Sequence, residues 1–443
     1  MSDHDTSEAA VFRKVSLRLL PFLFLLYVIN LIDRTNIGIA RLQMVDQQNI
    51  LDEEAYSLGA GIFYVGYFLF EVPSNLILLR MGARAWIARI LVSWGLISAA
   101  MMFVTGPWSF AVLRVLLGVA EAGFFPGVIY YLNDWFPARV RGRAVAQFML
   151  GGVIASMAGN PLSGFILQFT DRAAGLWGWQ WVFLLDGLPA VALGFVTLAY
   201  LTDRPEQARW LTPAERTWLA GQIENDRKHL PHGRHSLWAA VLDPRVWLLI
   251  AVYFTVAMGD NSYGFYVPTF LKSQFPEWSP FRIGLLAAAP SVIAMTGMVL
   301  VGRNSDRTGE RRWHVAGSAF TAAAGWLLIA LAASGRLAVP GVDTRWLFVL
   351  GVAVTLTGMK CMLPTFWTLP PSFLTGAAAA GGIALINSVG NLGGLLGPKV
   401  MGHAKARTDS FTAGYLVMAA ALLVGGLLVL GVTSRRMTPR PPS

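Results

Sequence analysis

Eight charged side chains lie inside long apolar stretches of this 443-residue sequence. A charge in the hydrocarbon region of a membrane costs at least a few kcal/mol on insertion scales, so each such residue needs a partner or a function. Buried acids can carry protons, while Arg and Lys can bind anions. The eight residues are Asp33, Arg34, Glu71, Arg114, Glu121, Asp186, Asp260 and Lys360.

Two arginines and two acids among them suit different tasks. A guanidinium keeps its charge and can hold a carboxylate through two hydrogen bonds, so Arg34 is the first candidate to bind an anionic group and Arg114 the second. A carboxylate in a low-dielectric site can bind a proton, and a neighbouring Arg favours its release. Asp33 and Glu121 are therefore the candidates to load and release protons.

The spacing of these four residues predicts that they can meet. Asp33 lies about fifteen residues, or roughly 22 Å, into the first apolar segment, and Arg114 lies about seven residues into the fourth. Glu121 is two helical turns beyond Arg114 on the same face. If the two helices adjoin, one line of charge runs from Asp33 and Arg34 through Arg114 to Glu121. The alternative is a purely structural ion-pair network.

The elements that must position these residues are membrane helices. Hydrophobic residues make up 55% of the chain and charged residues only 14%, against roughly 25% charged in an ordinary soluble protein. Apolar stretches close to the roughly 20 residues that span a bilayer recur along the whole length. We predict an all-α membrane protein with twelve transmembrane helices, at about 17–40, 56–79, 85–104, 107–133, 142–169, 179–202, 245–271, 281–302, 313–335, 345–371, 377–402 and 411–434.

Charge and composition predict the orientation and exclude several classes of protein. Lys and Arg concentrate in the N-terminus, the even-numbered loops and the C-terminus, which predicts that both termini are cytoplasmic and that the chain is a multi-pass protein of the inner membrane. The net charge of +10 therefore reflects orientation and not nucleic-acid binding. Cys361 is the single cysteine, which excludes an intramolecular disulfide. No metal site or other cofactor is expected.

A polar segment divides the chain into two halves. We expect an N-terminal six-helix bundle over 1–202, a cytoplasmic linker over 203–243 and a C-terminal six-helix bundle over 244–443. Within the linker, Thr212 and Glu215 have the spacing of a capping box, and Trp218, Leu219 and Ile223 form an apolar stripe. We expect an amphipathic helix on the cytoplasmic surface. A solvated linker helix is the alternative.

The two halves carry corresponding basic loops, which we expect to act as cytoplasmic gates. Gly82 and Gly309 occupy matching places in the two halves, and the same offset carries Asp33 onto Asp260. Repeated halves are a transporter architecture, and contacts at such loops can hold one conformational state and break in the other. The predicted gating residues are Arg80, Gly82, Arg84, Asp306, Arg307, Gly309 and Arg311.

The segment LIDRTNIG at 31–38, the loop from Gly302 to Arg312 and further motifs resemble those of a known group, the major facilitator superfamily, and within it the anion:cation symporter family. The second-half loop from Gly302 to Arg312 is similar to the superfamily signature, whereas Leu79 stands where the first-half pattern usually has Asp. Family-level matches are LIDRTNIG at 31–38, EVPSN at 71–75, RVLLGVAEAGFFP at 114–126, GWQW at 178–181 and NSVGNLGG at 387–394. Asp186 departs from the Glu expected there.

The resemblance implies two pseudo-symmetric bundles and extends the set of candidate ligands. In this family the Asp-Arg pair of the first helix and the Arg and Glu of the fourth are implicated in proton coupling and anion binding. The resemblance also implies Tyr67 and Asn391 as substrate ligands, to which we add Asn387, Trp367, Thr368 and Lys360. Lys360 either lines the cavity or extends toward the cytoplasm. Asp260 presents the same choice, whereas Glu71 and Asp186 are expected to be local structural partners.

The predicted function is proton-coupled symport of a small organic anion by alternating access, carried out by a monomer. Sugar acids, hydroxy-dicarboxylates and aromatic acids are the substrate classes that similar proteins handle. The chain has no GxxxxGK[ST] loop for ATP and no catalytic or metal cluster, so we expect neither a pump nor an enzyme. An organic-anion exchanger or uniporter is the alternative, followed by a transporter-like sensor.

Overall fold

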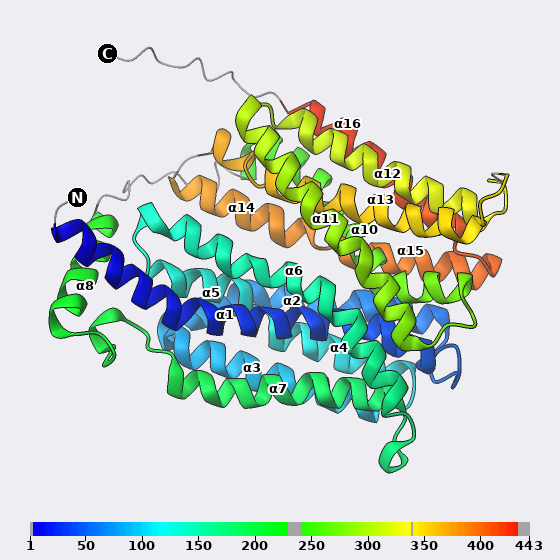
Figure 1. Ribbon diagram of the computed structural model, residues 1–443, viewed down its shortest axis with the longest axis horizontal. Coiled ribbons are helices and arrows are strands. Elements are labelled where there is room, and N and C mark those ends of the chain that lie inside the picture. The colour runs from blue at the N-terminus through cyan, green and yellow to red at the C-terminus, as the bar shows by residue number, and fades with distance from the viewer. Residues whose placement is uncertain (1–2, 229–240, 338–339, 375, 433–443) are drawn as a thin grey trace. The chain divides into compact units, whose positions relative to one another are not determined.

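The computed structural model describes residues 3–228, 241–337, 340–374 and 376–432, and it is almost entirely helical over these ranges (Figure 1). Residues 229–240 of the predicted linker lie outside the described part of the chain. Contacts between helices divide the chain into two compact units, Met1–Leu230 with Gly264–Ala289, and Pro231–Tyr263 with Pro290–Ser443. Each unit is described by itself below.

Among the described residues, eight α-helices lie wholly within the N-terminal unit. Their bounds are α1 Asp3–Met44, α2 Glu53–Met81, α3 Ala83–Ala100, α4 Pro107–Glu121, α5 Phe124–Asn133, α6 Ala138–Phe169, α7 Gly178–Tyr200 and α8 Pro213–Lys228. In this unit α1 packs on α6 and α7, α2 packs on α4, and α3 packs on α7. Small residues let these helices approach closely, because a Cβ added to Gly118 of α4 would lie 2.1 Å from the Phe63 carbonyl oxygen of α2.

Of the α-helices that the structure describes, two contribute to both units and five belong to the C-terminal unit. The shared helices are α10 Pro244–Gln274 and α11 Pro280–Thr308. The others are α12 Arg312–Ala333, α13 Thr344–Phe366, α14 Gly376–Gly390, α15 Gly393–Thr408 and α16 Thr412–Leu430. Helix α12 packs on α13 and on α16.

Within the described residues, ten helical stretches are long and apolar enough to span a membrane. Each of the ten corresponds to one of the twelve predicted crossings. The remaining two predicted crossings are helical but do not meet this criterion of length and apolar character. Helix α10 is long enough but carries the polar run Gly259–Tyr263 at its centre, and the segment 377–402 is interrupted between α14 and α15.

The fourth predicted crossing, 107–133, is confirmed as one apolar span, but its helix is broken between α4 and α5. Helix α4 ends at Glu121, and Gly123 adopts φ +88° before α5 begins. Pro126 has no N–H to donate to the Ala122 carbonyl four residues earlier. Ser74 of α2 supplies the missing donor, because its Oγ lies 2.7 Å from that oxygen. The break therefore places Glu121 at a helix end that α2 supports.

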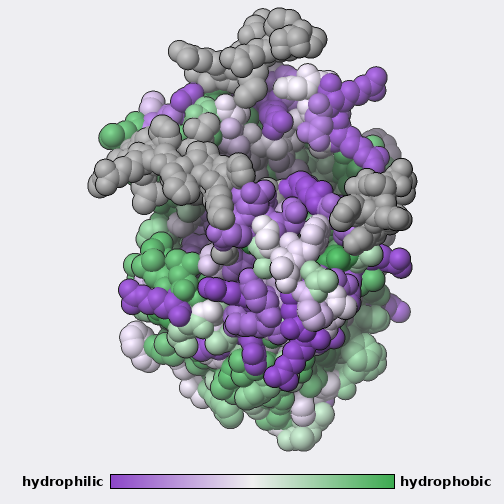
Figure 2. Space-filling view, turned by 90° about the vertical axis from the view of Figure 1, so that its left-hand side faces the viewer, coloured by the Kyte–Doolittle hydropathy of each residue, from purple (hydrophilic) through white to green (hydrophobic). Residues whose placement is uncertain are grey.

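The linker helix α8 is docked on the N-terminal part of α1. Thr212 and Glu215 form the predicted capping box, with N···O distances of 2.7 and 3.3 Å. Trp218 packs edge-on against Phe12 at 5.4 Å, and Leu219 is fully buried. Glu215 accepts a hydrogen bond from Lys14 at 2.9 Å, and this bond lowers the pKa of Glu215. The apolar stripe of α8 therefore packs against other parts of the protein. Figure 2 shows hydrophilic side chains gathered on the end of the molecule that carries α8.

Candidate functional site

A buried ion pair joins α1 to the end of α4 in the N-terminal unit. Arg34 Nη2 donates to Glu121 Oε1, and the same oxygen accepts a hydrogen bond from Asn30 Nδ2 at 2.8 Å. The Glu121 side chain is 1% exposed, whereas that of Arg34 is 24% exposed. Arg34 Cζ also lies 5.4 Å from the Tyr67 ring centroid. The guanidinium can therefore meet a ligand from outside while its carboxylate partner stays buried.

Asp33 lies one residue earlier but belongs to a different set of contacts. Its carboxylate accepts a hydrogen bond from Trp94 Nε1 at 2.7 Å and another from Ser98 Oγ, both on α3. Asn36 Nδ2 is the third donor, at 3.3 Å. The predicted line of charge therefore splits, because consecutive residues on a helix point in different directions.

Arg114 does not connect the two acids. Its Nε and Nη2 donate to the carbonyl oxygens of Gly59 and Ala60 of α2, both at 3.1 Å, and its side chain is 1% exposed. The close packing of α4 on α2 brings the guanidinium over that backbone. The expected path through Arg114 is therefore not formed in the structure. Arg34 is the more accessible of the two candidate anion ligands.

The candidate ligands of the C-terminal unit form two separate contacts. Lys360 of α13 pairs with Asp260 of α10 at 2.7 Å, and both side chains are about one third exposed. Lys360 therefore has an acid partner. Asn391 donates to Asn387 at 3.2 Å, and Asn391 lies in the break between α14 and α15.

Trp367 and Thr368 follow the end of α13. The Trp367 ring packs edge-on against the Tyr253 ring, with the two ring centroids 4.9 Å apart. The two rings form one aromatic surface in this unit. The Thr368 hydroxyl donates to the Thr365 carbonyl at 2.6 Å, so it is engaged in a local backbone contact. The Thr368 carbonyl in turn accepts a hydrogen bond from Arg311 Nη1 at 3.4 Å, which links this segment to one of the predicted gating residues.

The predicted gating loops have turn geometry. Gly82 and Gly309 have φ of +88° and +67°, values that favour glycine. In the first half, Asp203 accepts a hydrogen bond from the Arg84 backbone N–H at 2.9 Å and lies against Gly82. This acid supports the loop in which Leu79 replaces the usual Asp. Arg80 lies in the last turn of α2, and Asp306 and Arg307 lie in the last turn of α11.

Sequence reasoning missed the amides that organise the two acid clusters. Asn30 binds Glu121, and Asn36 binds both Asp33 and Asp186. Their signal is visible in the sequence, because both amides lie three residues from Asp33 inside an otherwise apolar helix. Unpaired amides in lipid are expensive, so each was a candidate contact from the start.

A second buried charge cluster surrounds Arg41 in the N-terminal unit. Arg41 is 1% exposed, pairs with Glu53 and with Asp46 at 3.2 Å, and donates to Thr269 Oγ1 at 2.8 Å. The rings of Tyr56 and Tyr266 flank its guanidinium. The cluster ties the final segment of α10 to α1 and α2.

Replacing Arg41 with Ala should destabilise the protein strongly. Removing one partner of a buried pair leaves an uncompensated charge, which typically costs about 3–5 kcal/mol. Thermal unfolding of the purified protein in detergent measures the effect. Arg345→Ala is the matched control, because Arg345 pairs with the exposed Asp343 and should lose about 1 kcal/mol or less. Equal shifts in Tm for the two variants would contradict this prediction.

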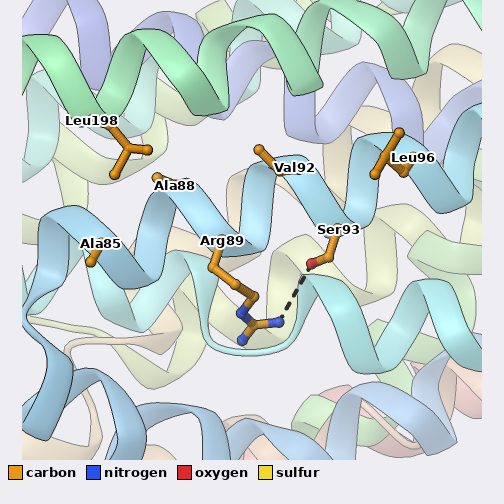
Figure 3. A pocket seen from close by; sticks show the side chains of 7 residues that line it. All are labelled: Ala85, Ala88, Arg89, Val92, Ser93, Leu96 and Leu198. Carbon is orange, nitrogen blue, oxygen red and sulfur yellow. Dashed lines mark hydrogen bonds between the residues drawn. The ribbon is translucent and has the colours of Figure 1, made fainter.

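A shallow groove of about 370 Å³ lies on the outer faces of α3 and α7 (Figure 3). Its lining is apolar except for Arg89 and Ser93, which hydrogen-bond to each other at 3.5 Å. None of the candidate site residues lines it. This groove is therefore distinct from the candidate site.

The chain is similar to known membrane transporters over most of its length. The family model for the Major Facilitator Superfamily matches residues 23–398. An Agrobacterium vitis protein named "Putative tartrate transporter" is 46% identical over 96% of this chain and 91% of its own length. The Escherichia coli inner membrane transport protein RhmT is 37% identical over 96% of each chain. The inward-open structure of the E. coli xylose transporter XylE has a TM-score of 0.73 at 16% identity, covering 96% of this chain and 98% of its own.

These comparisons confirm the predicted fold and the resemblance. The superfamily match spans most of the chain, and the structural similarity extends over nearly all of both chains. A twelve-helix transporter fold therefore accommodates the ten apolar spans together with α10 and the interrupted pair α14 and α15. The family is one of transporters and not of enzymes. The chain belongs to the major facilitator superfamily of membrane transporters.

Proposed function

We propose that this transporter takes up a small organic anion together with protons by alternating access. The observation that carries the proposal is the pair between the partly exposed Arg34 and the fully buried Glu121. An incoming carboxylate would compete with Glu121 for the same guanidinium. Once displaced, Glu121 would be a buried acid without a cation, a state that proton binding relieves. Anion binding and proton binding are thereby linked.

The substrate class is inferred from the same guanidinium and from the relatives. The Arg34 guanidinium can bind a carboxylate. The adjoining Tyr67 ring can contact the rest of the ligand. The A. vitis relative is named for tartrate, which supports a hydroxy-dicarboxylate among the acids to be tested. Sugar acids and aromatic acids belong in the same panel.

The proposal also covers the two halves of the carrier, its location in the cell and the ligands of the C-terminal unit. The helices of residues 1–202 and those of residues 244–443 would form the two halves of the carrier, with both termini in the cytoplasm. The name of the E. coli relative supports the inner membrane as the location. In the C-terminal unit the proposed ligands are Lys360, Trp367, Thr368, Asn387 and Asn391, and single Ala substitutions would rank them.

Uptake into proteoliposomes tests the function directly. Radiolabelled tartrate, a sugar acid and an aromatic acid are offered with and without an inward proton gradient, and a protonophore is the control. The proposal expects one acid to accumulate only when the gradient is present. Uptake that ignores the gradient would indicate an exchanger or uniporter instead. Lack of uptake across a broad panel would favour a sensor.

A further inference from the structure

Asp186 of α7 is a buried acid to which the proposed coupling mechanism assigns no role. Its side chain is 6% exposed, and its Oδ2 accepts a hydrogen bond from Asn36 Nδ2 at 3.0 Å. The same nitrogen lies 3.3 Å from Asp33 Oδ1. An amide nitrogen carries two hydrogens, so one group can bind both carboxylates at once. Two acids from different helices therefore share one neutral side chain.

Neither acid of this pair is in direct contact with a cation among the described residues. Within the described part of the chain, neither Asp33 nor Asp186 forms an ion pair with Lys or Arg. Arg34 is engaged with Glu121, and Arg114 is bonded to the α2 backbone. Two adjacent carboxylates in a low-dielectric interior cannot both be ionised without a large electrostatic cost.

The surroundings of the two acids are unequal. From α3, Trp94 and Ser98 donate hydrogen bonds to Asp33, and from α4 the charges of Glu121 and Arg114 act on Asp33 through space. Among the described residues, Asp186 has one hydrogen bond, from Asn36, and the nearby charge of Asp33. Donors stabilise an ionised carboxylate, so the acid with fewer donors is the better place for a proton.

We propose that Asp186 is a further proton-binding residue of this carrier and that it forms one proton site together with Asp33, held beside it by Asn36. Taking up a proton forms one O–H bond on the pair, and releasing it restores the carboxylate, so no further reactant is needed. The pair is separate from Glu121, which binds Arg34 and Asn30. This inference rests on the proposed proton coupling and extends it to a residue on α7.

Replacing Asp186 with Asn tests the proposal, because it keeps the shape and removes the proton site. With one pH unit across the membrane and no electrical potential, each coupled proton sustains about a tenfold accumulation of substrate. We expect Asp186→Asn to lower the accumulation ratio about tenfold and to lower the number of protons moved per substrate, while substrate exchange stays near the wild-type rate. A pH-sensitive dye inside the proteoliposomes counts the protons.

Two further variants separate proton binding from structure. Asp171→Asn is the matched control, because Asp171 binds Gln43 and the Gly178 N–H outside this pair, and it should keep the wild-type proton count. Asp186→Glu keeps an acid and should keep coupling. If Asp186→Asn does not fold, infrared difference spectra on acidification replace it, and Asp186→Glu should shift the band of a protonated carboxyl group.

The outcomes are distinguishable from failure of the proposed function. A wild-type protein whose uptake ignores the gradient contradicts proton coupling itself. Wild-type coupling that survives intact in Asp186→Asn overturns only the role of Asp186. Equal loss of exchange and accumulation in a well-folded Asp186→Asn protein, or an unshifted infrared band in Asp186→Glu, also overturns it, because either result indicates a structural role.

Discussion

Arg34→Ala should reduce the affinity for the transported acid about a hundredfold, and net uptake should fall with it. Truncating one partner of a buried, hydrogen-bonded charge pair typically costs about 2–5 kcal/mol, and about 3 kcal/mol corresponds to that factor. The variant loses the guanidinium that the substrate needs and also leaves Glu121 with only its Asn30 hydrogen bond. Substrate-dependent thermal stabilisation of the purified protein and uptake into proteoliposomes measure the two effects separately.

Arg34→Lys is the informative control for this prediction. It keeps the positive charge but cannot hold a carboxylate through two fixed hydrogen bonds, so we expect an intermediate loss of affinity. Arg114→Lys addresses the other candidate, and its effect should be on folding, because Arg114 is bonded to the Gly59 and Ala60 carbonyls. Wild-type affinity in Arg34→Ala would show that the anion binds elsewhere.

Glu121→Gln should abolish most proton-driven accumulation while substrate exchange continues. The amide keeps the shape of the side chain and can still accept the Asn30 hydrogen bond, but it cannot exchange a proton. It also no longer competes as an anion for Arg34, so the apparent affinity for substrate should rise. The accumulation ratio under a proton gradient and the rate of counterflow at equal pH provide the two measurements.

Full proton coupling in Glu121→Gln would refute the role of this acid. Loss of counterflow together with accumulation would instead show that Glu121 is needed for the structure around the break after α4. Asp171→Asn again serves as the neutralised acid outside the site. A double variant, Glu121→Gln with Asp186→Asn, should lose more coupling than either single variant if the two proton sites are separate.

Some features of the site were predictable from the sequence because they depend on residue type and spacing along one helix. The cost of a charge in an apolar segment identified Arg34, Glu121 and Lys360 without any contact information. The capping box of α8 was equally local, since Thr212 and Glu215 are three residues apart and bond to each other. Other features depended on which helices adjoin. Lys360 could not be placed until α13 was seen beside Asp260 of α10.

The break after Glu121 depends partly on the local sequence and partly on a neighbouring helix. Its cause, Pro126, is in the sequence, but many membrane helices absorb a proline without a break. What decides the outcome here is the Ser74 hydroxyl of α2, which satisfies the Ala122 carbonyl. A donor on another helix cannot be inferred from the spacing within α4.

The sequence by itself therefore determined the membrane character of the chain, the positions of most of its apolar spans, its superfamily and the charged residues that need a function. These depend on the free energy of transferring each residue into lipid and on local spacing. Only the tertiary structure decided how those charges pair. It joined Arg34 to Glu121, turned Arg114 onto the α2 backbone and placed Asp186 beside Asp33 through Asn36. Pairing requires two helices in contact, and residue spacing within one helix does not show which faces of different helices meet.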